Sequence, residues 1–267
     1  EIALSLYEAA VRLDPHFIMA HAQIANICVA KYRAYERSAM LIERTEEAAE
    51  TIRKCEGETA LYCCVMSSIC LCRGDVEGAL TYAQQSIQID PEFPPGYSTL
   101  AFAYGALGRR EEKVKALEVN IRLRENSLAG HTNLIMGING LGDMVRVQSA
   151  VAKAKPVFDR YIRLNPDDYD TRASIALIHS YSGNFALALT TADELSRIDS
   201  IDAVALYNLA CLYLKCNVPI RGIEHLRRAV VKGFRGIEAF HNDPDLESLR
   251  GTVEFEELMK ELEAGNV

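Results

Sequence analysis

The chain has 267 residues, 49% apolar and 25% charged, with a formal net charge of −8 at pH 7. The acidic excess argues against nucleic-acid binding, because proteins that bind nucleic acid present basic faces. The chain has no apolar run long enough to span a bilayer and no secretory leader, so we expect no membrane insertion. Strand-like alternation of apolar and polar residues is nearly absent, which predicts an all-α protein.

Eight cysteines occur in this long chain, unlike the short, loop-rich chains that disulfides hold together. We therefore expect reduced thiols and a cytoplasmic location. Cys63, Cys64, Cys70 and Cys72 fall on one expected helix, whereas zinc ligands usually come in pairs that flank a turn. Free cysteine packs as a small apolar residue. Packing is therefore the favoured interpretation of the cluster, and a metal or redox site is the alternative.

The first two expected helices cover residues 2–13 and about 17–31. The clearest helix pair lies further along the chain. One helix follows the turn at Gly74 and stops before Asp90 and Pro91. The next helix runs from Pro94 to Gly108. Gly74 and Gly108 are 34 residues apart, and the next turn glycine follows after 34 more. A helix pair that repeats with this period is typical of a solenoid of stacked repeats.

The chain resembles tetratricopeptide repeat (TPR) proteins in the positions that recur with this period. The slot that holds Leu-Gly in the TPR pattern is occupied at six places: Ile24-Ala25, Met66-Ser67, Leu100-Ala101, Leu134-Ile135, Ile175-Ala176 and Leu209-Ala210. The turn position that follows holds Gly74, Gly108, Gly142 and Gly183, and then Asn217. Asparagine is the usual substitute for glycine where the backbone is left-handed.

Two of the repeats are longer than the others, with steps of 42 and 41 residues in place of 34. We expect insertions near residues 32–44 and 143–152, taken up in a loop or as a lengthened second helix. After the later insertion we expect the second helix over residues 153–164, with Pro156 in its first turns.

The TPR resemblance implies a right-handed superhelix (α-solenoid) of antiparallel helix pairs. We expect one array over residues 1–267: a half repeat at 1–15, six helix pairs at about 16–234 and a C-terminal cap at 235–267. The helix at 2–13 lacks a partner helix, so its face of Leu6, Ala10 and Leu13 is expected to be partly exposed, or covered by an upstream element or a second copy.

The C-terminal cap contains two further helix signals. Asp243 and Pro244 suit a helix start, and a last helix is expected over about 253–263. This ending resembles the close of TPR arrays in bacterial multidomain signalling proteins of the adenylate cyclase, kinase and transcription-regulator types. That resemblance implies a regulatory array attached to something upstream.

Other motifs have ordinary explanations. Arg73, Gly74 and Asp75 spell an integrin-type tripeptide but coincide with a turn. The six histidines fall in different repeats without metal or catalytic spacing, and no nucleophile constellation is present. We therefore expect no enzyme activity, no cofactor and no metal. Residues 31–37 mix basic and aromatic side chains as an RNA contact does, and a solvated loop is the favoured interpretation.

TPR superhelices bind ligands on the concave face, which the first helix of each pair lines. By this resemblance the candidate binding residues are Asn26, Ser68, Phe102, Thr132, Asn133, Met136, Asn139, Leu177, Tyr207, Asn208 and Cys211. The lining positions hold no lysine or arginine, so the set that clamps a terminal carboxylate in chaperone-binding TPRs is absent.

The predicted function is a non-catalytic protein–protein interaction scaffold, the regulatory or partner-binding part of a larger protein. The neutral lining predicts an apolar segment of a protein or peptide as ligand, bound with weak salt dependence. Three alternatives remain: a small-molecule or peptide sensor, a lining filled by the chain itself, and self-association. A separate alternative site is the basic stretch of Arg227, Arg228, Lys232 and Arg235.

Overall fold

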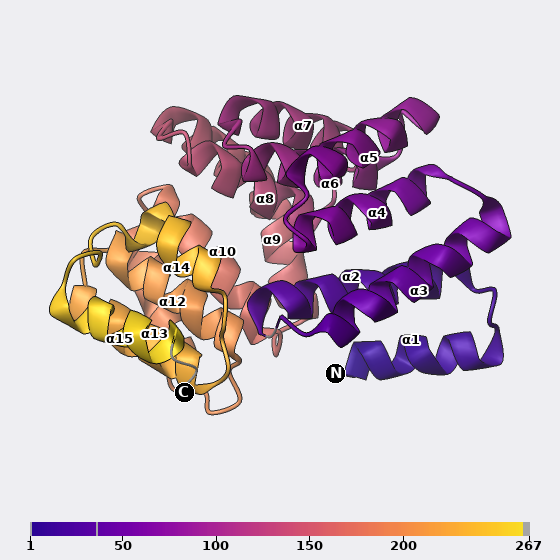
Figure 1. Cartoon of the computed structure of the whole chain (residues 1–267). Coiled ribbons are helices and arrows are strands. Elements are labelled where there is room, and N and C mark those ends of the chain that lie inside the picture. Colours follow the sequence, from indigo (N-terminus) through magenta and orange to yellow (C-terminus); the bar gives the residue numbers. More distant parts are fainter. Residues whose placement is uncertain (1, 36, 264–267) are drawn as a thin grey trace. The chain divides into compact units, whose positions relative to one another are not determined.

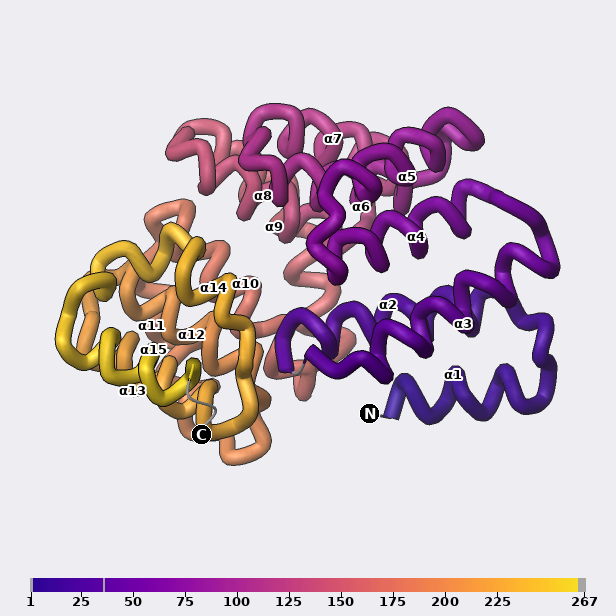
Figure 2. The backbone as a smooth tube through the Cα atoms, in the orientation of Figure 1, coloured from indigo at the N-terminus to yellow at the C-terminus, as the bar shows by residue number. Residues whose placement is uncertain are grey.

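The structure is a computed structural model that describes residues 2–35 and 37–263 (Figure 1). All regular elements of these residues are helices, joined by short turns that the backbone trace makes visible (Figure 2). The expected fold class, an all-α TPR solenoid of antiparallel helix pairs, is confirmed. The chain divides into two compact units, Glu1–Glu125 and Asn126–Val267, each with its own packing.

Among its described residues, unit 1 holds a single helix followed by three helix pairs. Within each pair, and between neighbouring pairs, consecutive helices pack on one another, and the first helices α2, α4 and α6 also pack in series. The helices are α1 (Ile2–Leu13), α2 (Ile18–Ala34), α3 (Ala39–Glu56), α4 (Ala60–Cys72), α5 (Val76–Ile89), α6 (Pro94–Ala106) and α7 (Arg110–Leu123).

Up to residue 263, unit 2 holds three helix pairs and a C-terminal group of short helices. The helices are α8 (Leu128–Asn139), α9 (Met144–Leu164), α10 (Tyr169–Tyr181), α11 (Phe185–Leu195), α12 (Ala203–Lys215), α13 (Pro219–Val231), α14 (Ile237–Asn242), the 3₁₀ helix η1 (Pro244–Leu246) and α15 (Val253–Glu263). Here α8, α10 and α12 pack in series, η1 packs on α12, and α15 packs on α13.

The turns inside the pairs follow one design. The turn positions expected to be left-handed have positive φ angles, from 70° at Gly108 to 84° at Gly183, and Asn217 adopts 60°. Beyond the Asn217 turn, the Val218 amide donates to Tyr213 O at 2.8 Å, which closes the preceding helix as in a Schellman motif. The substitution of asparagine for glycine at this turn is therefore confirmed.

The two longer repeats are accommodated by longer helices. The earlier insertion gives α2 17 residues and α3 18, against 13 in α4. The later one gives α9 21 residues. The expectation that this helix starts at residue 153 is wrong, because it starts at Met144, and Pro156 lies inside it. Residues 147, 151, 154 and 158 are all buried, so the apolar spacing of one helical face continues through the insertion.

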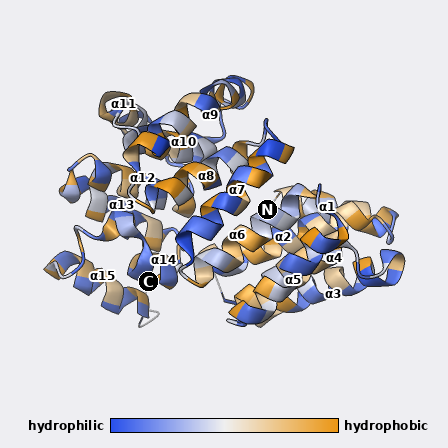
Figure 3. Ribbon diagram, turned by 90° about the horizontal axis from the view of Figure 1, so that it is seen from above, coloured by the Kyte–Doolittle hydropathy of each residue, from blue (hydrophilic) through white to orange (hydrophobic). Residues whose placement is uncertain are grey.

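Small residues allow the paired helices to approach closely. Ala79 and Ala83 in α5, and Ala188 and Ala192 in α11, are completely buried. At Gly222 in α13 an added Cβ would lie 2.6 Å from a methyl carbon of the facing helix α12. Each helix carries both hydrophobic and hydrophilic residues (Figure 3). The small residues therefore set the spacing within pairs, and larger apolar side chains fill the space between pairs.

The ends of the chain differ in how their apolar residues are covered. In α1, Leu4 is buried, whereas Leu6 and Leu13 are 64% and 89% exposed, which agrees with the partial exposure expected of this face. In the C-terminal group, Asp243 caps η1 by accepting a hydrogen bond from the Asp245 amide at 2.9 Å. The bounds of α15 agree with the expected last helix.

Candidate binding site

The first helices of unit 1 present an accessible surface, which we call the unit 1 face and define by Asn26, Ser68 and Phe102. These residues lie on α2, α4 and α6, which pack in series. Asn26 is exposed, Ser68 is half-buried, and Phe102 keeps 38% of its surface exposed. Ser68 Oγ donates to Cys64 O at 3.1 Å. The unit 1 face thus combines an open aromatic ring with two neutral polar groups.

Two basic side chains that the sequence pattern did not predict border Phe102. Arg33, in the extended last turn of α2, places its Cζ atom 5.2 Å from the centre of the Phe102 ring. Lys113 comes from the second helix α7, and its side chain lies against Gly105 of α6. Burial, followed by the charges of Arg33 and Arg110, lowers the pKa of Lys113. Arg33 belongs to the basic and aromatic stretch at residues 31–37, for which the sequence favoured a solvated loop. That interpretation is wrong for residues 31–34, because they continue α2.

The corresponding positions in unit 2 are covered. Leu177, Tyr207 and Cys211 are only 3%, 6% and 1% exposed. The expectation that these three side chains line an open groove is therefore wrong for the folded chain. Thr132 and Asn133 on α8 are half-buried, and Met136 is 42% exposed. The Asn208 amide donates to Ser174 Oγ at 3.0 Å, within the packed first helices.

The cover consists of residues 234–246, which we call the C-terminal segment. Phe234 stacks on Tyr207, with ring centres 4.5 Å apart and planes 14° from parallel. The completely buried Phe240 meets the Tyr207 ring edge-on at 5.8 Å. The Tyr207 hydroxyl donates to Asp243 Oδ2 at 2.8 Å, and the Tyr181 hydroxyl donates to Asp245 Oδ2. This arrangement corresponds to one of the alternatives considered from the sequence, in which the chain itself fills the lining of the groove.

The hydrogen bonds to Asp243 and Asp245 of the C-terminal segment are donated by uncharged tyrosine hydroxyls. Burial raises the pKa of both Tyr181 and Tyr207, so their hydroxyls remain protonated and able to donate. Burial and the neighbouring Asp243 carboxylate raise the pKa of Asp245 to about 6. The hydrogen bonds from Tyr181 and Asn139, with the charge of Lys215, oppose that rise in pKa. Asn139 therefore contacts this segment of the same chain.

The cysteine cluster packs as expected. Cys63, Cys64 and Cys70 are buried, and burial raises the pKa of each thiol. The Cys64 sulfur lies 3.2 Å from Ser86 Oγ, within hydrogen-bonding distance. In the part of the chain that the structure describes, no group of three or more His, Cys, Asp or Glu side chains is arranged to hold a metal ion. Cys63, Cys64 and Cys70 therefore pack as small apolar side chains, and Cys72 is half-buried.

The basic stretch considered as an alternative site is engaged within unit 2. The Arg228 guanidinium donates to Ser196 O at 3.1 Å, and Lys232 Nζ donates to Ile201 O at 2.8 Å. Arg227 lies 3.6 Å from a carboxylate oxygen of Glu257. These cations bind groups of their own chain, which leaves them little capacity for a separate anionic ligand.

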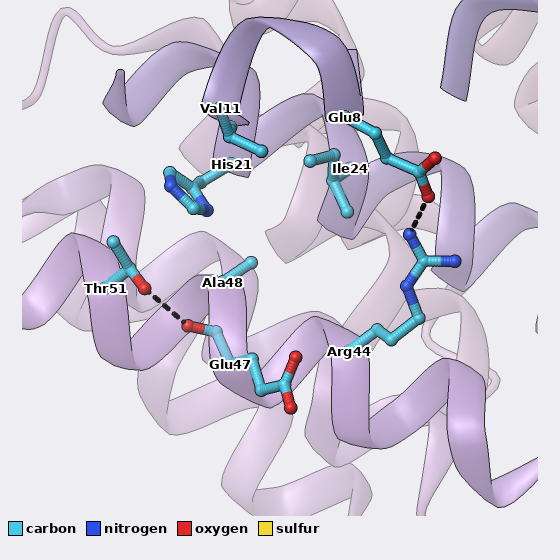
Figure 4. Close-up of a pocket in the computed structure, with 8 residues that line it drawn as sticks. All are labelled: Glu8, Val11, His21, Ile24, Arg44, Glu47, Ala48 and Thr51. Atoms are coloured by element: carbon cyan, nitrogen blue, oxygen red, sulfur yellow. Dashed lines mark hydrogen bonds and ion pairs between the residues drawn. The ribbon is translucent and has the colours of Figure 1, made fainter. Parts of the chain in front are cut away.

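A small pocket of about 250 Å³ lies between α1, α2 and α3 (Figure 4). Most of its polar side chains already have partners within the chain. The Glu8 carboxylate pairs with the Arg44 guanidinium, and the His21 Nε2 atom is 2.9 Å from Pro15 O. The Thr51 hydroxyl donates to Glu47 O at 2.9 Å. The pocket offers a place for a small molecule, but few free polar groups to recognise one.

No helix of residues 2–35 and 37–263 combines the length and apolar character needed to cross a bilayer. No protein-family model matches the chain. A stretch of 61 residues is 38% identical to a chloroplastic protein of Arabidopsis thaliana, and covers 23% of this chain and 18% of that protein. This short match does not define the family of the whole chain.

Several solved structures share the fold. The APC/C hetero-tetramer Cut9–Hcn1 aligns with a TM-score of 0.61 at 14% identity, over 97% of this chain and 52% of that one. A tetratricopeptide repeat protein from Parabacteroides merdae aligns with a TM-score of 0.50 at 15% identity, over 97% and 91% of the two chains. A thermophilic TPR protein of Thermus thermophilus aligns at 0.51 and 16% identity, over 76% and 100%. This chain therefore has the TPR fold.

Proposed function

We propose that the chain is a non-catalytic scaffold that binds a peptide segment of a partner protein on the unit 1 face. The observation that carries this proposal is the accessibility of Phe102, beside Asn26 and Ser68, on three first helices packed in series. Exposed aromatic rings on rigid elements are typical binding anchors. In unit 2 the same kind of surface is already occupied by the C-terminal segment.

The structural neighbours support a binding role. Cut9–Hcn1 is itself an assembly of two different proteins, built on the fold that this chain shares. We further propose that the chain acts in the cytoplasm as the regulatory or partner-binding part of a larger protein. An apolar side chain of the partner is expected to cover Phe102, because burial of apolar surface contributes roughly 25 cal/mol per Å².

The test is a displayed library of short random peptides, selected on the folded chain and measured afterwards by fluorescence anisotropy. Phe102→Ala should weaken the selected peptides by about tenfold or more, since anchor residues often contribute about 2 kcal/mol or more. Phe17→Ala is the matched control, because Phe17 is an exposed phenylalanine of unit 1 outside the unit 1 face. Equal effects of the two substitutions would place the binding site elsewhere.

Self-association is a second candidate, and the exposed side of α1 favours it. Leu6 and Leu13 are exposed on this helix, and isolated large apolar patches often mark interaction surfaces. Under this proposal the chain forms dimers at micromolar concentration, and Leu6→Glu with Leu13→Glu gives monomers. Sedimentation equilibrium measures the difference, and a wild-type chain that stays monomeric rules out the candidate.

A further inference from the structure

Two cations, Arg33 and Lys113, lie near Phe102, and no described residue gives either of them an acidic partner. Arg33 stands over the ring, with its Cζ atom 5.2 Å from the ring centre. Lys113 passes along Gly105, one turn after Phe102, where an added Cβ would lie 3.5 Å from Lys113 Cδ and 3.8 Å from Nζ. Within the described ranges 2–35 and 37–263, neither Arg33 nor Lys113 has a hydrogen bond or ion pair to a protein group.

The positive charges of Arg33 and Lys113 are not balanced by a described carboxylate, although the chain has more acidic than basic side chains. It contains 37 acidic against 29 basic side chains, yet none of the described carboxylates pairs with Arg33 or Lys113. The positive charges of Arg33 and Arg110 act on the half-buried Lys113 ammonium. Like charges gathered where water is partly excluded are unfavourable unless an anion joins them. Binding an anionic group would therefore relieve a repulsion that the folded chain carries.

We propose that this cluster recognises a carboxylate-bearing peptide segment, with its Asp or Glu side chain between Arg33 and Lys113 and an adjacent apolar side chain on Phe102. This inference rests on the proposed function and names the chemistry of its ligand. Guanidinium donors match a carboxylate in geometry, and hydrogen bonds to charged groups are stronger than neutral ones. The exposed part of the Phe102 ring provides the apolar contact.

The C-terminal segment shows that first helices of this chain accept such an occupant. Asp243 and Asp245 receive hydrogen bonds from Tyr207 and Tyr181 of α12 and α10, while the buried Phe240 contacts the Tyr207 ring. Acidic and apolar side chains thus act together on a first-helix surface of unit 2. In unit 1 the donors are cations, which suits a ligand carboxylate that is fully ionised at neutral pH.

A nucleic acid fits the cluster less well than an acidic peptide. Binding of a single strand needs a basic track along successive phosphates, with aromatic rings for successive bases. The chain has a net charge of −8, and its other basic stretch, at Arg228 and Lys232, is bound to backbone carbonyls. The experiment therefore includes a single-stranded RNA, whose tighter binding would contradict the proposal.

The experiment selects short random displayed peptides on the folded full chain and measures the enriched sequences by fluorescence anisotropy. We expect an Asp or Glu next to an apolar residue in each. Arg33→Gln and Lys113→Gln should each weaken binding by about tenfold or more, as for loss of a charge-assisted hydrogen bond. Lys115→Gln is the matched control, because Lys115 is an exposed lysine of α7 two residues away. Raising the salt from about 50 mM to about 500 mM should also weaken binding.

The stability of each variant, measured by urea unfolding, separates loss of fold from loss of contact. Lys113→Gln should leave stability unchanged or raised, because it removes an unpaired charge. Enriched peptides without acid that still require Phe102 would overturn the carboxylate assignment and leave the proposed function standing. Peptides indifferent to Phe102→Ala, or no enrichment at all, would count against both.

Two further probes test the identity of the anion. A labelled single-stranded RNA that binds more tightly than the enriched peptides, and loses affinity with Arg33→Gln, would overturn the peptide assignment. A peptide that binds with phosphoserine but not with glutamate at the acidic position would overturn the assignment to a carboxylate.

Discussion

Phe240→Ala should release the C-terminal segment from the first helices of unit 2 without unfolding the rest of the chain. Phe240 is completely buried and meets three other rings: Tyr207 and Phe234 at 5.8 Å, and Phe255 at 6.2 Å. It is therefore the point at which α14 joins both the first helices and α15. Truncation removes the ring that all of these contacts share.

The expected cost follows from burial. Truncation of a buried phenylalanine to alanine destabilises proteins by about 3–5 kcal/mol, through lost transfer energy and the cavity that remains. Local opening of a segment costs less than global unfolding, because core helices require the most free energy to open. The two hydrogen bonds from Tyr207 and Tyr181 contribute only about 1.5–3 kcal/mol each. They are not expected to hold the segment closed once Phe240 is removed.

Hydrogen exchange monitored by mass spectrometry measures the opening directly. In the variant, amides of residues 237–246 should exchange markedly faster, while those of α10 and α12 keep most of their protection. Phe185→Ala is the matched control, because Phe185 is a phenylalanine of unit 2 that is 45% exposed. The reasoning would be refuted if the two variants showed the same protection across residues 237–246.

Three further predictions concern packing, pH and thiol chemistry. Gly222→Ala should destabilise unit 2 by about 1–2 kcal/mol in urea unfolding. The added methyl group overlaps α12, and the cost of that overlap exceeds the gain in helix propensity from glycine to alanine. Burial and the neighbouring Asp202 raise the pKa of Asp170 to about 7, so its contribution to stability is complete below about pH 3.9 and is lost as the pH rises through about 7. Asp170→Asn should remove this loss and raise the free energy of unfolding at pH 8 by about 1 kcal/mol. The effect is small because Asp170 is still open to solvent. The exposed Cys55 should react with a thiol reagent in the folded chain, and buried Cys64 only on unfolding.

Each of these predictions has a clear contrary result. An unchanged unfolding midpoint for the glycine variant would mean that α12 and α13 move apart at no cost. A stability difference for the Asp170 variant that does not grow with pH would show that the two carboxyl groups do not share a proton. Labelling of Cys64 as fast as that of Cys55 in the folded chain would contradict the burial of Cys64. About one zinc ion per purified chain, lost with Cys70→Ser, would contradict packing as the role of the cysteine cluster.

The fold was predictable because each repeat needs the same types of residue at the same positions, so the sequence pattern occurs several times. Glycine at the left-handed turn and small residues between paired helices recur at one period, so one poor match, such as Asn217, does not weaken the pattern. The start of α9 was missed because the repeat pattern has no position for its insertion. Only the apolar spacing through Val147 and Val151 shows that a single helix continues there.

The site was less predictable, because a lining position does not reveal what covers it. Tyr207 and Cys211 occupy lining positions in the repeat, yet both are buried, and the C-terminal segment that contacts Tyr207 lies well beyond that repeat in the sequence. Arg33 was missed for a related reason. It lies in an extra turn of α2 that the repeat pattern does not contain, and it reaches Phe102 two first helices further on.

The occupied and the unoccupied surface differ in the kind of donor they present, and this difference assigns their roles. In unit 2 neutral tyrosines meet Asp245, whose pKa of about 6 means that its ionised form is disfavoured there. Its contribution to stability is present below about pH 3.9 and is lost as the pH rises through about 6. At neutral pH the segment is therefore held mainly by apolar burial around Phe240. In unit 1, none of the described carboxylates pairs with Arg33 or Lys113. These two cations are the reason for proposing that the unit 1 face takes a ligand that is ionised at neutral pH.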